Sequence, residues 1–152
     1  MQHATQADFK PFDASDWKIG IVTAQFNKHI TEKQLNSALE AAKTYKIPEK
    51  NITIVRVAGA IEIPLALQKL AIGGQYKALL ALGCIIQGET PHFDYVAKYV
   101  TEGILRVQLD ESISIGFGIL TCNDEEQALV RTELAGDHLE AALQQAHTFH
   151  TS

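Results

Sequence analysis

Short apolar runs alternate with longer amphipathic stretches along most of this chain. Four runs of strand length, at residues 18–24, 52–57, 78–82 and 114–120, are separated by segments in which apolar residues recur every three or four positions. The third run is apolar on both faces, which is typical of a parallel strand covered by helices on each side. This alternation, with right-handed crossovers, predicts a three-layer α/β/α domain of the flavodoxin-like type with a four-stranded, mainly parallel sheet.

Capping residues predict where the intervening helices begin. Thr31 opens a capping-box pattern for the helix that follows the first strand. Thr90 is the predicted N-cap of a later helix, with Pro91 at its first helical position. Asn123 is the predicted cap of a further helix, and a last helix is expected over roughly residues 135–146.

The length of 152 residues fits a single domain, which we expect at residues 17–152. Residues 1–16 are polar and aperiodic, so we expect an arm that orders only if something outside the core binds it. The net charge of −5, without a run of lysines or arginines, argues against a nucleic-acid partner. Charged residues make up 20% of the chain, below the roughly 25% typical of soluble domains, which indicates surface hidden beyond what a monomer requires.

The sequence offers neither a recognisable targeting signal nor a reactive or metal-binding cysteine pattern. The longest nearly apolar stretch, residues 78–86, is far shorter than the roughly 20 residues needed to cross a bilayer, so no membrane span is expected. The first residues offer neither a basic nor an apolar region of an export signal, so a cytoplasmic location is expected. Cys84 and Cys122 match neither a CxxC pair nor a zinc spacing, which predicts reduced, partly buried thiols.

Ligands of open parallel sheets bind beyond the carboxyl ends of the strands, so the loops there are the candidate site. His92 falls in a first helical turn, where the helix dipole disfavours imidazolium and leaves a neutral ring that can accept and return a proton. Glu89 and Thr90 belong to a glycine-containing turn whose free N–H groups could hold a phosphate. Arg131 could direct its donors at the same anion. The alternatives are a surface histidine, an ordinary cap and a solvated arginine.

Three further residues in or near these loops have two interpretations each. Phe26 follows a strand end, where its ring could stack on a ligand or cap the core. Glu62 could bind ligand hydroxyls or complement a helix dipole. Phe117 stands between two glycines, which allows close backbone approach, although an inward-facing strand residue is the stronger interpretation.

Four loop strings together are more specific than any of these residues alone. The chain carries QFN at residues 25–27, GAIEIP at 59–64, LGCIIQGETPHFDYV at 82–96 and GILTCN at 118–123, followed by EQA at 126–128 and Arg131. In this order, from residue 18 to about residue 146, the strings closely resemble the 6,7-dimethyl-8-ribityllumazine synthase family.

The resemblance implies the penultimate step of riboflavin biosynthesis. In that step 5-amino-6-(D-ribitylamino)uracil condenses with 3,4-dihydroxy-2-butanone 4-phosphate to give 6,7-dimethyl-8-ribityllumazine, phosphate and water, and no metal or organic cofactor is expected. By matching positions, His92 would move protons, as the catalytic residue. The residues implied in substrate binding are Phe26, Ala60, Ile61, Glu62, Cys84, Ile85, Ile86 and Phe117, and those implied in phosphate binding are Glu89, Thr90 and Arg131.

The resemblance also implies a pentamer whose sites are shared between adjacent subunits, with a larger shell left open because the family uses the arm in inter-subunit contacts. A neighbour's Phe117 and Arg131 would complete each site, which would account for the low charge. Gln25 and Gln87 stand where the family often has arginine, and residues 132–138 are shortened and lack the usual lysines. The missing lysines leave a non-catalytic flavin- or pterin-binding paralogue as one alternative, and the low charge leaves an oligomeric scaffold as another.

Overall fold

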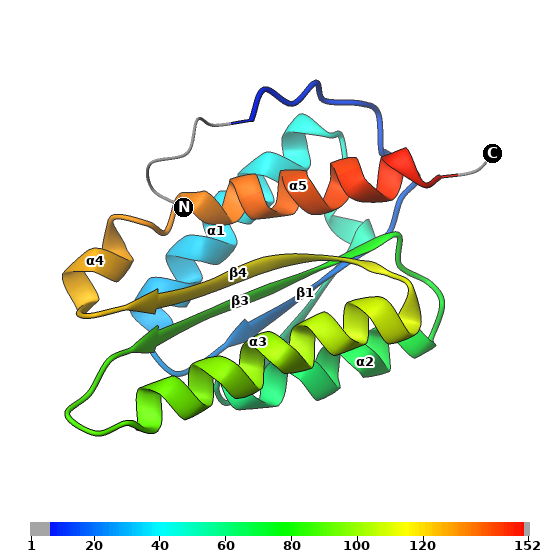
Figure 1. The fold of residues 1–152 in the computed structure, drawn as a ribbon. Coiled ribbons are helices and arrows are strands. Elements are labelled where there is room, and N and C mark those ends of the chain that lie inside the picture. The colour runs from blue at the N-terminus through cyan, green and yellow to red at the C-terminus, as the bar shows by residue number, and fades with distance from the viewer. Residues whose placement is uncertain (1–6, 151–152) are drawn as a thin grey trace.

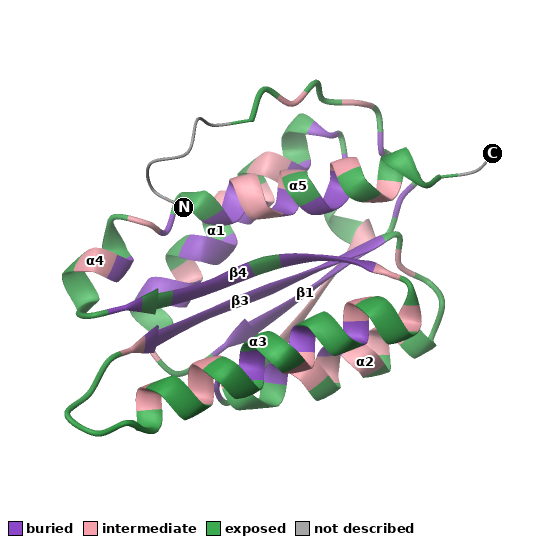
Figure 2. Ribbon diagram, in the orientation of Figure 1, coloured by how far each residue is buried: buried purple, intermediate pink, exposed green. Residues whose placement is uncertain are grey.

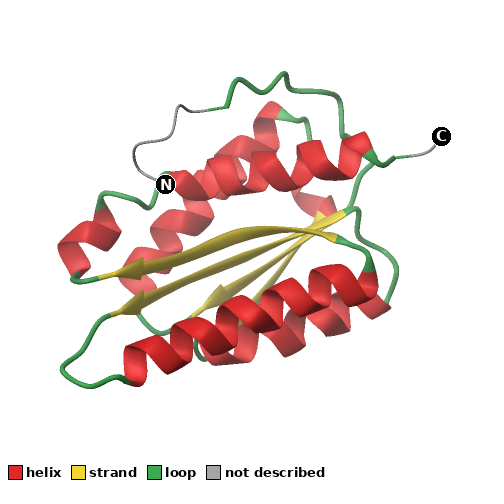
Figure 3. Ribbon diagram, in the orientation of Figure 1, coloured by secondary structure: helices red, strands yellow, loops and turns green. Residues whose placement is uncertain are grey.

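The computed structural model describes residues 7–150, in which four parallel strands lie between two layers of helices (Figures 1 and 3). Strands β1 (Ile19–Ala24), β2 (Ile52–Val57), β3 (Ala78–Ile86) and β4 (Ser114–Cys122) are ordered β2-β1-β3-β4. Helices α1 (Lys28–Thr44) and α5 (Leu134–Thr148) cover one face, and α2 (Ile63–Ile72) and α3 (His92–Glu111) cover the other. The predicted three-layer α/β/α flavodoxin-like fold is confirmed, with every strand pair parallel.

The hydrophobic core lies on both faces of the two central strands, β1 and β3 (Figure 2). Ile19 and Ile21 of β1 pack toward α1 and α5, whereas Val22 and Ala24 pack toward α2 and α3. Each buried aliphatic side chain stabilises the fold by roughly 1.5–3 kcal/mol, so burial on both faces favours a continuously apolar strand. The core thus fixes where the carboxyl ends of these strands emerge.

Helix α1 begins earlier than the capping-box pattern predicts. It starts at Lys28, so Thr31 lies inside the helix, and its buried hydroxyl donates a 2.7 Å hydrogen bond to the carbonyl oxygen of Ala24. The predicted capping box at Thr31 is wrong because the Thr31 hydroxyl bonds the end of β1 instead of capping the helix. The preceding residue, Asn27, adopts a left-handed conformation with φ 61° and ψ 42° and begins the helix through its backbone.

Two other predicted helix starts are displaced by one residue. The short helix α4 (Glu125–Leu129) is capped by Asp124, whose carboxylate accepts a 2.8 Å hydrogen bond from the Gln127 N–H, so the prediction of Asn123 is wrong. Helix α3 begins at His92 with Pro91 as the N-cap residue, and the Thr90 hydroxyl accepts from the His92 N–H at 3.3 Å. Thr90 therefore lies one residue before the N-cap position, and its hydroxyl still accepts a hydrogen bond from the first helical residue.

Strands β3 and β4 run further than the apolar runs predict. They remain paired up to Ile86 and Cys122, whereas β1 pairs with β3 only as far as Leu82. Residues 83–86, predicted as the start of a loop, therefore belong to β3. Phe117 lies in the middle of β4 opposite Ala81, as the strand predicted at residues 114–120 expects.

The part of the N-terminal arm that the structure describes packs on the chain's own core. The Phe12 ring stacks on His147 with centroids 4.0 Å apart, and it also meets Tyr45 edge-on. Ala14 is fully buried, and its N–H donates to the carbonyl oxygen of Tyr45 at 2.9 Å. The expectation that this arm needs an outside partner is wrong at these residues, because Phe12 supplies an apolar anchor, while residues 1–6 lie outside the described part.

Candidate active site

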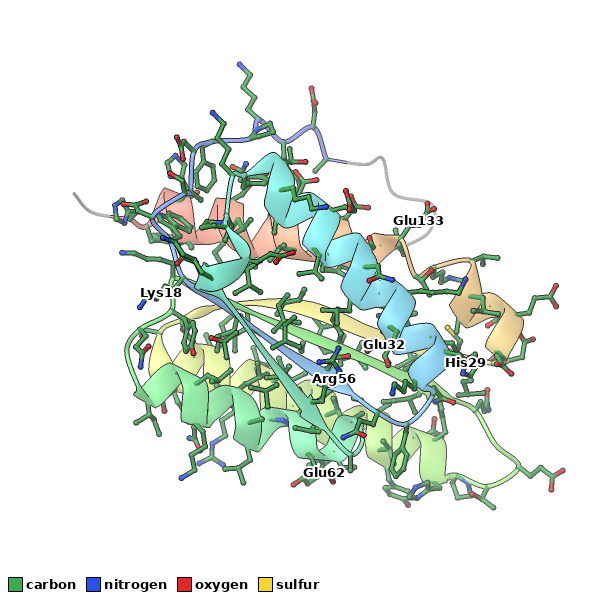
Figure 4. All side chains as sticks on the ribbon, turned by 180° about the vertical axis from the view of Figure 1, so that it is seen from behind. Lys18, His29, Glu32, Arg56, Glu62 and Glu133 are labelled. Carbon is green, nitrogen blue, oxygen red and sulfur yellow. The ribbon has the colours of Figure 1, made fainter. Side chains whose placement is uncertain are left out.

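Four strand ends and the helices that follow them converge at one edge of the sheet (Figure 1). Figure 4 shows His29 and Glu62 toward this edge, whereas Lys18 lies toward the opposite end of the sheet. Helix N-termini here leave backbone N–H groups without intrahelical partners, which favours anions. This edge is also where open parallel sheets bind ligands.

Phe26 projects its ring over the loop that follows β2. The N–H groups of Gln25 and Phe26 donate to the carbonyl oxygens of Val57 and Ala58 at 2.8 Å and 2.9 Å, which ties the two loops together. The Phe26 ring lies so close to Gly59 that a Cβ there would stand 2.5 Å from Cδ2. The side chain is nevertheless 68% exposed, so it does not cap the core and one face of the ring can receive a ligand.

The turn Ala60–Glu62 (η2) is a single 3-10 turn that closes on Gly59. The Gly59 N–H donates to Glu62 Oε1 at 2.9 Å, and the Glu62 N–H donates to the carbonyl oxygen of Gly59 at 3.1 Å. One carboxylate oxygen of Glu62 thus satisfies the local backbone, as the dipole-complementing interpretation expects, while the side chain remains exposed. The turn also contacts β3 and α3, which places Ile61 beside the other loops.

Asn27 links the end of β1 to β3, a role that the sequence did not indicate. Its side-chain Nδ2 donates a 3.0 Å hydrogen bond to the carbonyl oxygen of Cys84. The signal available in the sequence was an asparagine just before a helix, because asparagine tolerates the left-handed conformation better than most residues. The partner, 57 positions away, could not be read from that signal.

Cys84 and Cys122 are free and buried, which confirms the prediction of reduced thiols. Burial raises the pKa of Cys84 to about 12, and the nearby Cys122 acts in the same direction. Burial also raises the pKa of Cys122, although the Arg131 guanidinium opposes that shift. Both thiols are therefore protonated and poorly nucleophilic near neutral pH, and only the backbone of Cys84 is suited to contact a ligand.

The loop between β3 and α3 carries three of the predicted site residues on one exposed segment. Its first residue, Gln87, donates its N–H to the carbonyl oxygen of Cys122 at 2.9 Å. Glu89, Thr90 and His92 are all exposed, and His92 is the first residue of α3. The Thr90 hydroxyl accepts a hydrogen bond from the His92 N–H, so its own hydrogen remains available for an anion. This arrangement places a titratable ring beside a helix N-terminus.

Phe117 lies away from that loop, whereas Arg131 lies beside Cys122, whose carbonyl oxygen bonds the Gln87 N–H at the start of the loop. Arg131 follows α4, and its Nη1 donates to the carbonyl oxygen of Gln127 at 2.8 Å. Phe117 is five positions before Cys122 in β4, roughly 17 Å along the strand from its end. Its ring is 38% exposed on this edge strand, so the interpretation of Phe117 as an inward-facing residue is wrong. One chain therefore brings Phe26, residues 60–62 and residues 84–86 together but leaves Phe117 apart.

Two kinds of feature are absent from residues 7–150. No three histidine, cysteine, aspartate or glutamate side chains gather there into a group that could hold a metal ion. None of the helices in that range is both long and apolar enough to span a membrane.

The chain is similar to known proteins over most of its length. The model of the 6,7-dimethyl-8-ribityllumazine synthase family matches residues 16–150. A protein of that name from Desulfovibrio desulfuricans is 43% identical over 119 residues, which cover 78% of this chain and 76% of the relative. Another of that name, from Mycobacterium sp. (strain KMS), is 46% identical over 129 residues, which cover 85% of this chain and 78% of the relative.

Proposed function

Because the chain belongs to the 6,7-dimethyl-8-ribityllumazine synthase family, a family of enzymes, we propose that it condenses 5-amino-6-(D-ribitylamino)uracil with 3,4-dihydroxy-2-butanone 4-phosphate. The product is 6,7-dimethyl-8-ribityllumazine, with phosphate and water released. The observation that carries this proposal is the meeting of three features at one edge of the sheet. They are the exposed Phe26 ring, the backbone edge of β3 beyond Leu82, and the helix N-terminus at His92.

The pyrimidine fits the first two of these features. A flat ring can stack on the exposed face of Phe26, and backbone groups of residues 84–86 can hydrogen-bond its polar edge. The turn with Ala60, Ile61 and Glu62 lies close enough to the other loops to bind the ribityl chain. These contacts hold one reactant in a fixed orientation, and orientation alone can supply much of the rate of a condensation.

The reaction then needs proton transfers and a place for the departing phosphate. The amine attacks the ketone and forms an imine with loss of water, phosphate leaves by elimination, and the resulting carbonyl is captured by the second amine with loss of water. His92 moves protons in these steps, which is worth roughly 10²–10⁴ in rate. The N-terminus of α3, the Glu89-Thr90 segment and Arg131 bind the phosphate dianion.

We propose that each site is shared between adjacent subunits of a pentamer. Phe117 lies too far from the strand ends to cover a pyrimidine bound in its own chain. A neighbour that presents its β4 edge to these loops would supply Phe117 and, with it, the Arg131 of that chain.

The direct test mixes the protein with both substrates and follows the fluorescence of the lumazine. We expect product to form faster than in the uncatalysed mixture. A rate no higher than the uncatalysed one would refute the synthase.

The second candidate, a binding module without turnover, is favoured by the glutamines at positions 25 and 87, which carry no charge to hold a phosphate. Tight riboflavin binding without product formation would support that module instead.

A further inference from the structure

We infer that Asn27 is a positioning residue for the pyrimidine subsite, because its side chain takes the place of β1 along the last residues of β3. This inference rests on the proposed function, in which the backbone of residues 84–86 binds the pyrimidine. Asn27 does not touch the reacting atoms. It fixes the backbone edge to which the pyrimidine hydrogen-bonds.

The need for such a residue comes from the unequal lengths of the strands. β3 pairs with β4 as far as Ile86, but its pairing with β1 ends at Leu82. On the β1 side, the last four residues of β3 therefore have no strand partner among the described residues. A strand end that is paired on one side only is free to twist or fray. The Asn27 amide bonds the carbonyl oxygen of Cys84 at 3.0 Å, in the middle of this unpaired stretch.

The same geometry leaves the next backbone groups open for a ligand. Peptide groups of alternate residues in a strand face the same side, and Gln87 directs its N–H to β4 by bonding the carbonyl oxygen of Cys122. Ile86 therefore presents its N–H and C=O on the side of Cys84, away from β4. Once Asn27 has fixed the Cys84 carbonyl, the groups of Ile86 stand at a set position, facing the loops after β1 and β2.

The conformation of Asn27 also links this edge to the ring of Phe26. With φ 61° and ψ 42°, the chain turns sharply after Phe26, which leaves the ring over Gly59 and directs the next side chain to β3. Asparagine and glycine tolerate this conformation, whereas alanine is disfavoured there. One residue therefore sets the spacing between the stacking ring and the hydrogen-bonding edge, the two features that would hold the pyrimidine.

Two variants separate the amide from the backbone conformation. Asn27→Gly keeps the left-handed turn and removes the amide, and Asn27→Asp keeps the shape but replaces the donor with a carboxylate that cannot donate to Cys84. The matched control is Asn51→Gly, since the Asn51 amide also donates to a backbone carbonyl oxygen, that of Ser15 at 3.2 Å, before the start of β2.

The readouts are the KM for each substrate, kcat, the thermal midpoint, and the Kd of 6,7-dimethyl-8-ribityllumazine from its fluorescence. For both Asn27 variants we expect the KM for the pyrimidine and the Kd of the lumazine to rise roughly 3- to 10-fold, the loss that one neutral hydrogen bond predicts. The KM for the phosphate-bearing substrate should stay within about twofold, because Asn27 bonds β3 and not the loop at residues 87–91. Asn51→Gly should leave all three constants unchanged.

The outcomes distinguish this inference from the proposed function. If the unaltered protein forms the lumazine but the Asn27 variants keep its pyrimidine KM and its lumazine Kd, the positioning role is overturned and the synthase stands. A lower thermal midpoint with unchanged constants overturns it as well, since the amide would then be merely structural. If the unaltered protein neither forms nor binds the lumazine, the proposed function fails first and the inference fails with it.

Discussion

Single residues at the carboxyl edge differ in how firmly the fold holds them. Phe26 and His92 are exposed, so the core does not depend on their side chains. Glu62 and Asn27 instead bond backbone groups, and the buried Cys84 contributes to the packing beneath them. Substitutions of the exposed residues should therefore change activity without unfolding the protein, whereas substitutions beneath them should change both.

His92→Ala should lower kcat without lowering stability. We expect a fall of roughly 10²-fold, because positioning and the uncatalysed condensation remain when the proton-transfer group is lost. Steady-state fluorescence kinetics measure this effect, and a thermal melt checks the fold. His29→Ala is the matched control, because His29 is exposed in the first turn of α1 and contacts the Glu125 carboxylate. An unchanged kcat in His92→Ala would remove this residue from the mechanism.

Gly59→Ala should weaken pyrimidine binding by displacing Phe26. The added Cβ would stand 2.5 Å and 2.9 Å from two atoms of the Phe26 ring, so the exposed ring must swing away. The backbone at Gly59 is extended, with φ −148°, and imposes no strain of its own. We expect the KM for the pyrimidine to approach that of Phe26→Ala. Gly73→Ala, at the end of α2, is the control that should leave this KM unchanged, and equal KM values for both glycine variants would contradict the ring displacement.

The buried Cys84 thiol should make stability fall at high pH. Its pKa is about 12 in the folded state against an ordinary value of 9.0, so between these values the unfolded chain loses a proton that the folded chain keeps. This stabilisation is complete below pH 9 and is lost as the pH rises toward 12. Denaturant unfolding from pH 8 to 11 should show the stability advantage of the unaltered protein over Cys84→Ala shrinking, by up to about 1.4 kcal/mol per pH unit above pH 9. A constant advantage would mean that the thiol titrates normally.

At the scale of helices and strands, the sequence predicts what lies within an element better than where the element ends. The double-sided apolar run of β3 and the stripe on α1 depend on local periodicity, and both are confirmed. The ends depend on distant partners. Thr31 lies inside α1 because its hydroxyl bonds the end of β1. Strand β3 extends through Cys84 to Ile86 because it remains paired with β4. The loop sequences therefore predict which loops form the candidate site. The hydrogen bond from Asn27 to Cys84 can be seen only in the tertiary structure.

The contact between α2 and α3 should be sensitive to a single methyl group. A Cβ at Gly103 would stand 2.7 Å and 2.9 Å from Pro64 Cγ and Cβ, so Gly103→Ala must push the helices apart. Overpacking of this kind costs about 1–3 kcal/mol, which exceeds the gain of at most about 1 kcal/mol from the better helix propensity of alanine. We expect the thermal midpoint to fall by about 2–4 °C relative to the exposed-site control Glu102→Ala. A thermal midpoint equal to that of the control would show that α2 and α3 move apart without loss of stability.

At the scale of the whole molecule, the low charge of the sequence corresponds to apolar side chains left on the surface. Figure 2 shows exposed positions along the outer faces of α2 and α3 and on the edge strand β4. The large exposed apolar residues of these elements are Leu65, Ile72, Tyr95, Tyr99, Leu105, Leu109 and Phe117. Exposed apolar surface is typical of protein interfaces, which supports the proposed assembly. The proposed function adds a stronger reason, because under it Phe117 would serve the site only from another chain.

A shared site predicts that two impaired variants recover activity when they are mixed. His92→Ala damages the loop side of a site, and Phe117→Ala damages the side that a neighbour would supply. When equal amounts are unfolded and refolded together, about one quarter of the sites in a randomly mixed ring should combine an intact His92 with an intact neighbouring Phe117. Fluorescence kinetics of the mixed oligomers, isolated by sedimentation, should show that activity returning. His92→Ala mixed with Phe26→Ala is the control without recovery, since both residues belong to the same side. Mixed oligomers no more active than the control would place the whole site in one chain and remove the reason for a neighbour.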